Sequence, residues 1–273
     1  MPARELEPAR WLVEAVTEFT GRVEQLMPAG YDRCVRIFHR PDQGLAYDGA
    51  ARSWAEVATR HGTTLHQEAQ WTALTGGRVD SPHRPGPESP TDHPLTGSLD
   101  RGLLSRLSEV LAAHTTTPEV CHFTLYKGIG TAPLTWHAHP GFSLPDRTHW
   151  LFAPVPVPEL PAYAVELAVS GLEEQSRQPG GIRGLVTLVR PKQPEDSVSW
   201  VRRMREDGVV QSPSWWWPQD RAWVVHTEFD YDSTLVACSS DAARALLDDP
   251  EIECLRVSPS TSLLINADRV NGG

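Results

Sequence analysis

The stretch that most restricts the fold of this chain is residues 213–234, PSWWWPQDRAWVVHTEFDYDST, which carries four tryptophans and four acidic residues. Residues 222–229 alternate between outward and inward positions, as a half-buried strand does. Residues 230–233 are typical of a turn, and 234–238 return as a second strand. The stretch therefore predicts a β-hairpin that the chain enters through a run of aromatic residues.

The aromatic run before this hairpin indicates a binding surface. If the run is extended, Trp216 points away from Trp215 and Trp217, so the three rings cannot share one core, and at least one should be partly exposed or lie over a second surface. Exposed tryptophan and arginine are common anchors of protein interfaces. We expect a binding site made of Trp215, Trp216, Trp217, Arg221 and Trp223. The other interpretation is a rim of tryptophans that seals the edge of the sheet.

The rest of the chain divides into helical and extended patterns. The first helices are expected at 9–26, 53–62, 71–74 and 99–113, the second of them opened by the capping-box pattern Ser53-Trp-Ala-Glu56. Strands are expected at 31–39, 119–127, 134–138, 148–155, 182–190 and 252–257, and further helices at 161–176, 195–206 and 241–248.

This order of elements predicts the fold class. Helices cluster in the N-terminal half and strands follow, which indicates an α+β fold with a mainly antiparallel sheet. We expect the N-terminal and C-terminal helices to pack on that sheet. Residues 1–273 should form a single α+β domain, with a mobile loop at 76–98, where Gly and Pro are frequent and apolar periodicity is lost.

The formal net charge of −10 restricts the partners. Nucleic-acid phosphates and anionic membrane surfaces attract basic proteins, so we expect neither as a partner. No apolar run approaches the ~20 residues of a membrane span, and the N-terminus lacks the apolar core of a signal peptide. The cysteines are far apart in sequence, which favours reduced, buried thiols and a cytoplasmic protein.

A second candidate site consists of carboxylates and imidazoles. Glu228, Asp230 and Asp232 alternate, so on a strand they would share one face, where their oxygens suit a divalent cation. His137 and His139 alternate in the same way, and neutral imidazole is a common metal ligand. The other interpretation is that the two aspartates form the hairpin turn and the two histidines are surface or structural residues.

A mixed metal site would require the two segments to meet. If they do, the ligands would be His137, His139, Asp230 and Asp232, and the cofactor would be a divalent metal. His149, ten residues after His139, is a further histidine of the same region.

Motifs for nucleophilic catalysis and for phosphate binding are incomplete. The chain has no GxSxG elbow, and the adjacent Cys121 and His122 would face opposite sides of a strand. Gly128-Ile-Gly130 and Gly180-Gly181 are not followed by the helix that a dinucleotide site or a P-loop needs. No catalytic residue can therefore be assigned from motifs.

Several blocks of the chain resemble an uncharacterised family of actinobacterial proteins. They are YDRCVRIFH (31–39), SWAEV (53–57), HTTTPEVCHFTLYKGIG (114–130), LPDRTHWLF (144–152) and WPQDRAWVVHTEFDYDST (217–234). The family has no established activity, so the resemblance implies no catalytic residue and no ligand. It implies that these pieces belong to one folding unit, of which the hairpin is a regular part.

Two functions follow from these patterns. We expect a non-enzymatic binding or regulatory module, which uses the aromatic surface to hold a protein or a small-molecule ligand. Its acidity suits the neutralisation of a basic protein partner, and it needs no cofactor. The alternative is a metal-dependent hydrolase, in which a metal held by an Asp/His site lowers the pKa of its bound water.

Overall fold

The computed structural model describes residues 1–41, 53–76, 94–129, 132–176 and 211–272. The strand expected at 182–190, the helix expected at 195–206 and most of the loop expected at 76–98 lie outside these residues.

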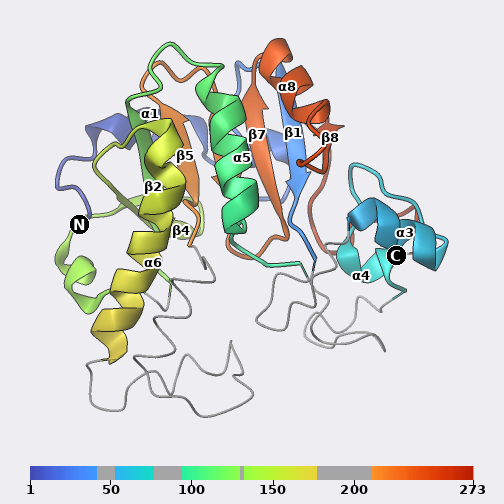
Figure 1. The fold of residues 1–273 in the computed structure, drawn as a ribbon, viewed down its shortest axis with the longest axis horizontal. Coiled ribbons are helices and arrows are strands. Elements are labelled where there is room, and N and C mark those ends of the chain that lie inside the picture. The colour runs from blue at the N-terminus through green and yellow to red at the C-terminus, as the bar shows by residue number, and fades with distance from the viewer. Residues whose placement is uncertain (42–52, 77–93, 130–131, 177–210, 273) are drawn as a thin grey trace.

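In the described part of the chain, eight strands form one sheet in the order β3-β4-β2-β5-β6-β7-β1-β8, and every neighbouring pair is antiparallel (Figure 1). The strands are β1 (Arg33–Phe38), β2 (Cys121–Tyr126), β3 (Phe142–Leu144), β4 (Arg147–Leu151), β5 (Trp215–Pro218), β6 (Val224–Thr227), β7 (Ser233–Cys238) and β8 (Cys254–Val257). The early strand β1 lies between the two last strands of the chain. The predicted α+β class with a mainly antiparallel sheet is confirmed.

Helices cover both faces of this sheet. The helices are α1 (Arg10–Ala15), α2 (Val23–Leu26), α3 (Trp54–His61), α4 (Trp71–Leu74), α5 (Arg101–Ala112), α6 (Leu160–Ser176) and α8 (Ser240–Leu247), with short 3-10 helices η1 (Glu7–Ala9), η2 (Leu134–Ala138) and η3 (Val157–Glu159). Helices α5, α6 and α8 cross one face, and α1 lies on the other (Figure 1). In the described parts of the chain, no helix combines the length and apolarity that crossing a membrane requires.

The tryptophan run forms β5 and contributes to both cores. Trp216 packs in the apolar cluster under α5, α6 and α8, whereas Trp215 and Trp217 pack in the cluster on the α1 face. The predicted alternation of the rings is confirmed. Of the two expected outcomes, a partly exposed ring or a ring over a second surface, the structure shows the second, because all three rings and Trp223 are at most 1% exposed. Helices cover both faces of the strand, so a ring is buried whichever way it points.

Local signals explain where several elements begin and end. Ser53 Oγ accepts from the backbone N–H of Glu56 at 3.1 Å, and Glu56 Oε2 accepts from the N–H of Ser53 at 3.0 Å. This capping box opens α3, and Gly62, in the left-handed region with φ 68°, ends it. The helix predicted from this pattern is confirmed.

Two predicted elements differ from the structure. The helix expected at 9–26 ends at Ala15, because Val16 is extended and Gly21 has φ 78°, and a separate turn forms α2. Residues 134–138 form η2 and not a strand. Pro133 and Pro140 border this segment, and proline cannot donate to a strand ladder.

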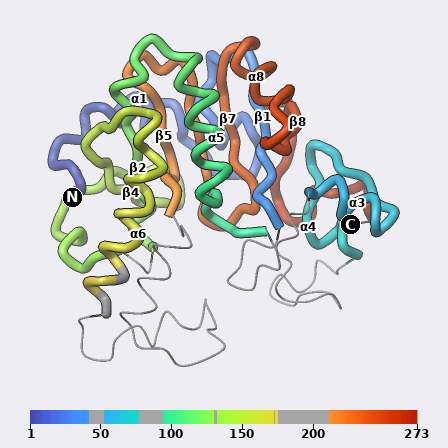
Figure 2. The backbone as a smooth tube through the Cα atoms, viewed as in Figure 1, coloured from blue at the N-terminus to red at the C-terminus, as the bar shows by residue number. Residues whose placement is uncertain are grey.

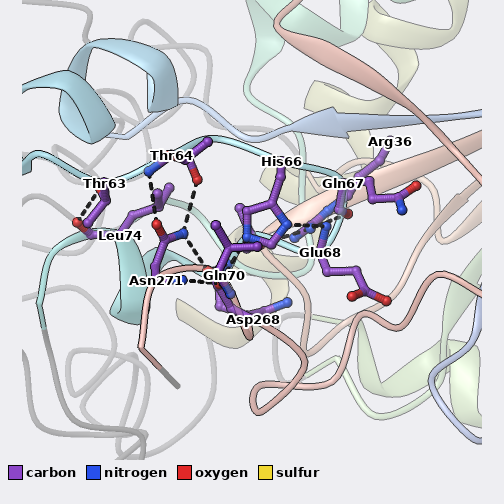
Figure 3. Close-up of polar contacts among 12 residues, drawn as sticks. Arg36, Thr63, Thr64, His66, Gln67, Glu68, Gln70, Leu74, Asp268 and Asn271 are labelled. Carbon is purple, nitrogen blue, oxygen red and sulfur yellow. Dashed lines mark hydrogen bonds and ion pairs between the residues drawn. The ribbon is translucent and has the colours of Figure 1, made fainter.

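The C-terminal segment is fastened beside α3 and α4 (Figure 2). The buried carboxylate of Asp268 accepts from His66 Nε2 at 2.9 Å, from the N–H of Gln70 at 3.2 Å and from Asn271 Nδ2 at 2.8 Å (Figure 3). The Asn271 amide also bonds both backbone groups of Thr64. Burial alone would raise the pKa of Asp268, but these hydrogen bonds lower it. The end of the described chain is therefore a fixed part of the fold.

Candidate functional site

Charged and titratable side chains gather at the end of the sheet where β6 turns into β7. We call Arg147, His149, His226, Glu228 and Asp230 the Arg147 cluster. Arg147 Nε donates to Glu228 Oε1 at 3.0 Å, and Nη2 lies 2.9 Å from the same oxygen and 2.5 Å from Asp230 Oδ2. One guanidinium therefore pairs with two carboxylates of the hairpin.

This contact spans several strands. β2 and β5 lie between β4, which carries Arg147, and β6. The guanidinium reaches the hairpin past the end of β2, where its Cζ lies 5.1 Å from the centre of the Tyr126 ring. Tyr126 in turn packs against Phe229, with ring centres 5.5 Å apart. An aromatic pair thus supports the ion pairs.

Glu228 is the buried member of the cluster. His226 Nε2 lies 3.7 Å from Glu228 Oε2, and the His226 ring stacks on Trp215 with centres 3.7 Å apart. Burial alone would raise the pKa of Glu228, but His226 and Arg147 outweigh burial and lower the pKa to about 2. Glu228 is therefore a permanent carboxylate at neutral pH and a poor proton donor.

His149 is the neutral member of the cluster. Its ring is 2% exposed and stacks on Phe142 with centres 5.8 Å apart. Burial, assisted by the neighbouring His226, lowers the pKa of His149 to about 3. Its Nδ1 has no hydrogen-bond partner within the described residues. A buried neutral imidazole of this kind makes the fold sensitive to acid.

We expect His149→Gln to make the protein less sensitive to acid. In the unfolded chain the His149 pKa returns to 6.5. The stability that the neutral, buried imidazole contributes is therefore complete above pH 6.5 and is lost as pH falls toward 3. The loss should reach about 2–3 kcal/mol by pH 4.5. Glu228 adds to the acid lability only below its ordinary pKa of 4.5. Urea unfolding at pH 7.5 and at pH 5 should give a smaller difference in the variant.

His137→Gln is the matched control, because His137 is exposed on η2. It should reproduce the pH dependence of the wild type. An unchanged pH dependence in His149→Gln would show that His149 does not resist protonation in the folded state.

The two aspartates of the alternative metal site pair with two different arginines. Asp230 bonds Arg147, and Asp232 Oδ1 lies 3.5 Å from Arg36 Nη2. His137 packs against Trp150 on η2, with ring centres 5.1 Å apart. Across the described ranges, no three His, Cys, Asp or Glu side chains are grouped so as to hold a metal ion. The alternative metal site required His137 and His139 to meet the two aspartates, and within the described residues these side chains form no such group.

The thiols are poorly suited to nucleophilic catalysis. Cys34, Cys121, Cys238 and Cys254 are free. Burial raises the pKa of Cys34, Cys238 and Cys254 to about 12 and also raises that of Cys121. The thiolate is the reactive form, so these residues are protonated at neutral pH. The imidazole next to Cys121, on His122, interacts with Gln219 at 2.7 Å.

One His–Asp pair has the composition of a catalytic dyad but serves the fold. His66 Nε2 bonds Asp268, and the Nδ1 of the same ring accepts from the N–H of Glu68 at 3.3 Å (Figure 3). Both ring nitrogens are therefore engaged. The imidazole has no nitrogen left to activate a nucleophile in this arrangement.

The exposed part of the site lies at the hairpin tip. We call Tyr126, Phe229 and Asp230 the hairpin surface. Phe229 is 40% exposed, and the Asp230 side chain is 65% exposed. Sequence analysis missed Phe229 and Tyr126. The signal for Phe229 was its place between two acidic residues next to a predicted turn, where an apolar side chain has no position in the core.

The hairpin tip is held rigidly from behind. The N–H of Gly97 donates to Tyr231 O at 2.8 Å, and the N–H of His39 donates to Asp232 O at 3.0 Å. Gly97 has φ 71°, and a Cβ there would lie 2.4 Å from the Phe229 oxygen, so only glycine fits. The hairpin surface is thus preorganised.

Arg221 is exposed, unlike the four tryptophans expected to bind with it. Its guanidinium lies 4.9 Å from the centre of a half-buried ring, which belongs to Trp11 of α1. The ring beside Arg221 therefore comes from a distant segment.

Comparison of the chain with protein-family models, with curated proteins and with solved structures finds no match. The arrangement of its own residues is therefore the basis for a functional proposal.

Proposed function

We propose that this chain is a non-enzymatic binding module that holds a basic protein partner on the hairpin surface. The observation that carries the proposal is the position of Phe229 and Asp230. A large apolar ring and a carboxylate are exposed side by side on a rigid turn. Interface anchors are commonly aromatic residues next to polar groups on a preorganised base.

The charge of the surface supports a basic partner. Glu228 and Asp230 both pair with Arg147, so two carboxylates against one guanidinium leave an excess of negative charge. The whole chain has the same sign, with a formal net charge of −10. Complementary charge favours association with a basic protein and disfavours an acidic one. Four free thiols support a reducing compartment, and we propose the cytoplasm.

The ionic contacts also favour binding over hydrolysis. The carboxylates expected to act as metal ligands are paired with arginines, and the thiols are protonated. These contacts stabilise one arrangement of the charged side chains at the surface.

Affinity capture with Phe229→Ala/Asp230→Asn tests the proposal. Immobilised wild-type protein should retain basic proteins from a cell extract in a salt-sensitive manner. The double variant should retain them roughly 30-fold less, because loss of an interface anchor costs at least ~2 kcal/mol. Quantitative mass spectrometry of the bound proteins is the measurement.

The matched control is Val13→Ala/Asp241→Asn, which removes one exposed apolar side chain and one exposed carboxylate elsewhere. It should behave as the wild type does. Equal retention by the hairpin variant, or enrichment of acidic proteins, would contradict the proposal.

A further inference from the structure

We propose that the hairpin surface recognises an arginine side chain of the partner protein. This inference rests on the proposed binding function and names the chemistry that the surface accepts. It starts from the chain's own Arg147, which already occupies one side of the site.

The two acceptors of Arg147 differ in burial. The Glu228 side chain is 5% exposed and accepts from Arg147 Nε and Nη2 at 3.0 and 2.9 Å. The Asp230 side chain is 65% exposed and accepts from Nη2 alone. If Asp230 turns toward solvent, Arg147 keeps the buried carboxylate as its partner. Asp230 can therefore accept an incoming cation without leaving a buried charge uncompensated.

The aromatic pair beside Asp230 suits a planar cation. Phe229 and Tyr126 are tilted by 54° with ring centres 5.5 Å apart, and the guanidinium of Arg147 already lies over Tyr126. The Phe229 ring is 40% exposed. An incoming guanidinium can stack on Phe229 while its N–H groups bond the oxygens of Asp230.

This geometry distinguishes arginine from lysine. A guanidinium is flat, weakly hydrated and able to donate two parallel hydrogen bonds to a carboxylate, whereas an ammonium is a strongly hydrated point charge. Stacking on an aromatic face also favours arginine. A surface that offered charge alone would bind both residues equally.

Two synthetic peptides test the inference. One carries spaced arginines in a Gly-Ser background, and the other carries lysines at the same places. Calorimetric titration of the full chain should show at least about five-fold tighter binding of the arginine peptide. Asp230→Asn should weaken arginine binding about ten-fold and remove the preference, because the paired carboxylate is lost. Asp241→Asn, which changes the net charge by the same amount, should change neither.

The outcomes separate this inference from the binding function. Equal affinities for the two peptides, both lowered by Phe229→Ala, would overturn arginine recognition and leave the hairpin surface as the binding site. Binding that no hairpin variant changes would overturn both. If neither peptide binds, arginine recognition is overturned, and the capture experiment decides the binding function separately.

Discussion

Trp216→Ala should lower the free energy of unfolding by about 3–5 kcal/mol, as loss of a fully buried large aromatic ring does. The ring is 0% exposed and packs edge-on against Trp223, with ring centres 5.0 Å apart. Domains are typically stable by only ~5–15 kcal/mol, so the variant should be partly unfolded at ambient temperature or unfold at much lower denaturant. Urea unfolding followed by circular dichroism measures the change.

Arg221→Ala is the contrasting variant, in the turn that joins β5, the strand of Trp216, to β6. The side chain is exposed, so its loss should cost less than about 1 kcal/mol, since a cation–π contact at an exposed site is worth ~0.5–1 kcal/mol. A Trp216→Ala protein as stable as Arg221→Ala would contradict the buried position of the ring. If Trp216→Ala loses partner binding, the cause would be unfolding, because the buried ring cannot contact a partner.

Arg36→Ala should lower the free energy of unfolding by about 3–5 kcal/mol, because it removes one partner of a buried ion pair. Arg36 is 1% exposed, and its Nη2 lies 3.5 Å from Asp232. It also donates to Ser233 Oγ at 2.9 Å and to the carbonyls of Gln67 and Ala69 at 3.1 and 2.8 Å. These acceptors would lose their donor together. Thermal and urea unfolding measure the effect.

Arg33 provides the control, because it lies on the same strand and is exposed. Arg33→Ala should change the unfolding free energy by less than about 0.5 kcal/mol. If both substitutions have the same small effect, Arg36 does not join β1 to the hairpin turn and to the segment before α4.

Short-range signals predicted much of the fold. The capping box at Ser53 and Glu56, with Gly62 after it, lies within ten residues and correctly bounds α3. The hairpin of β6 and β7 follows from alternation around a turn. In such elements, the residues that decide the structure are neighbours in sequence, and no knowledge of the distant chain is needed.

Long-range packing decided what the sequence did not reveal. Whether Trp216 is buried depends on which helices cover the sheet, and alternation shows only that it faces away from its neighbours. The contact of Arg147 with Glu228 depends on the order of four strands. The pattern of alternate carboxylates suggested one divalent cation, and the cations in the structure are two guanidinium groups, Arg147 from β4 and Arg36 from β1.

The position of β1 has a consequence for synthesis. Its residues 33–38 pair with 233–238 on one side and with 254–257 on the other. A ribosome adds about 5–20 residues per second, so β1 waits roughly 10–40 s before its partners exist. During that time Val35 and Ile37, both buried in the finished sheet, have no strand beside them. The newborn chain must therefore keep an apolar strand from pairing wrongly until residues 233–257 leave the ribosomal tunnel.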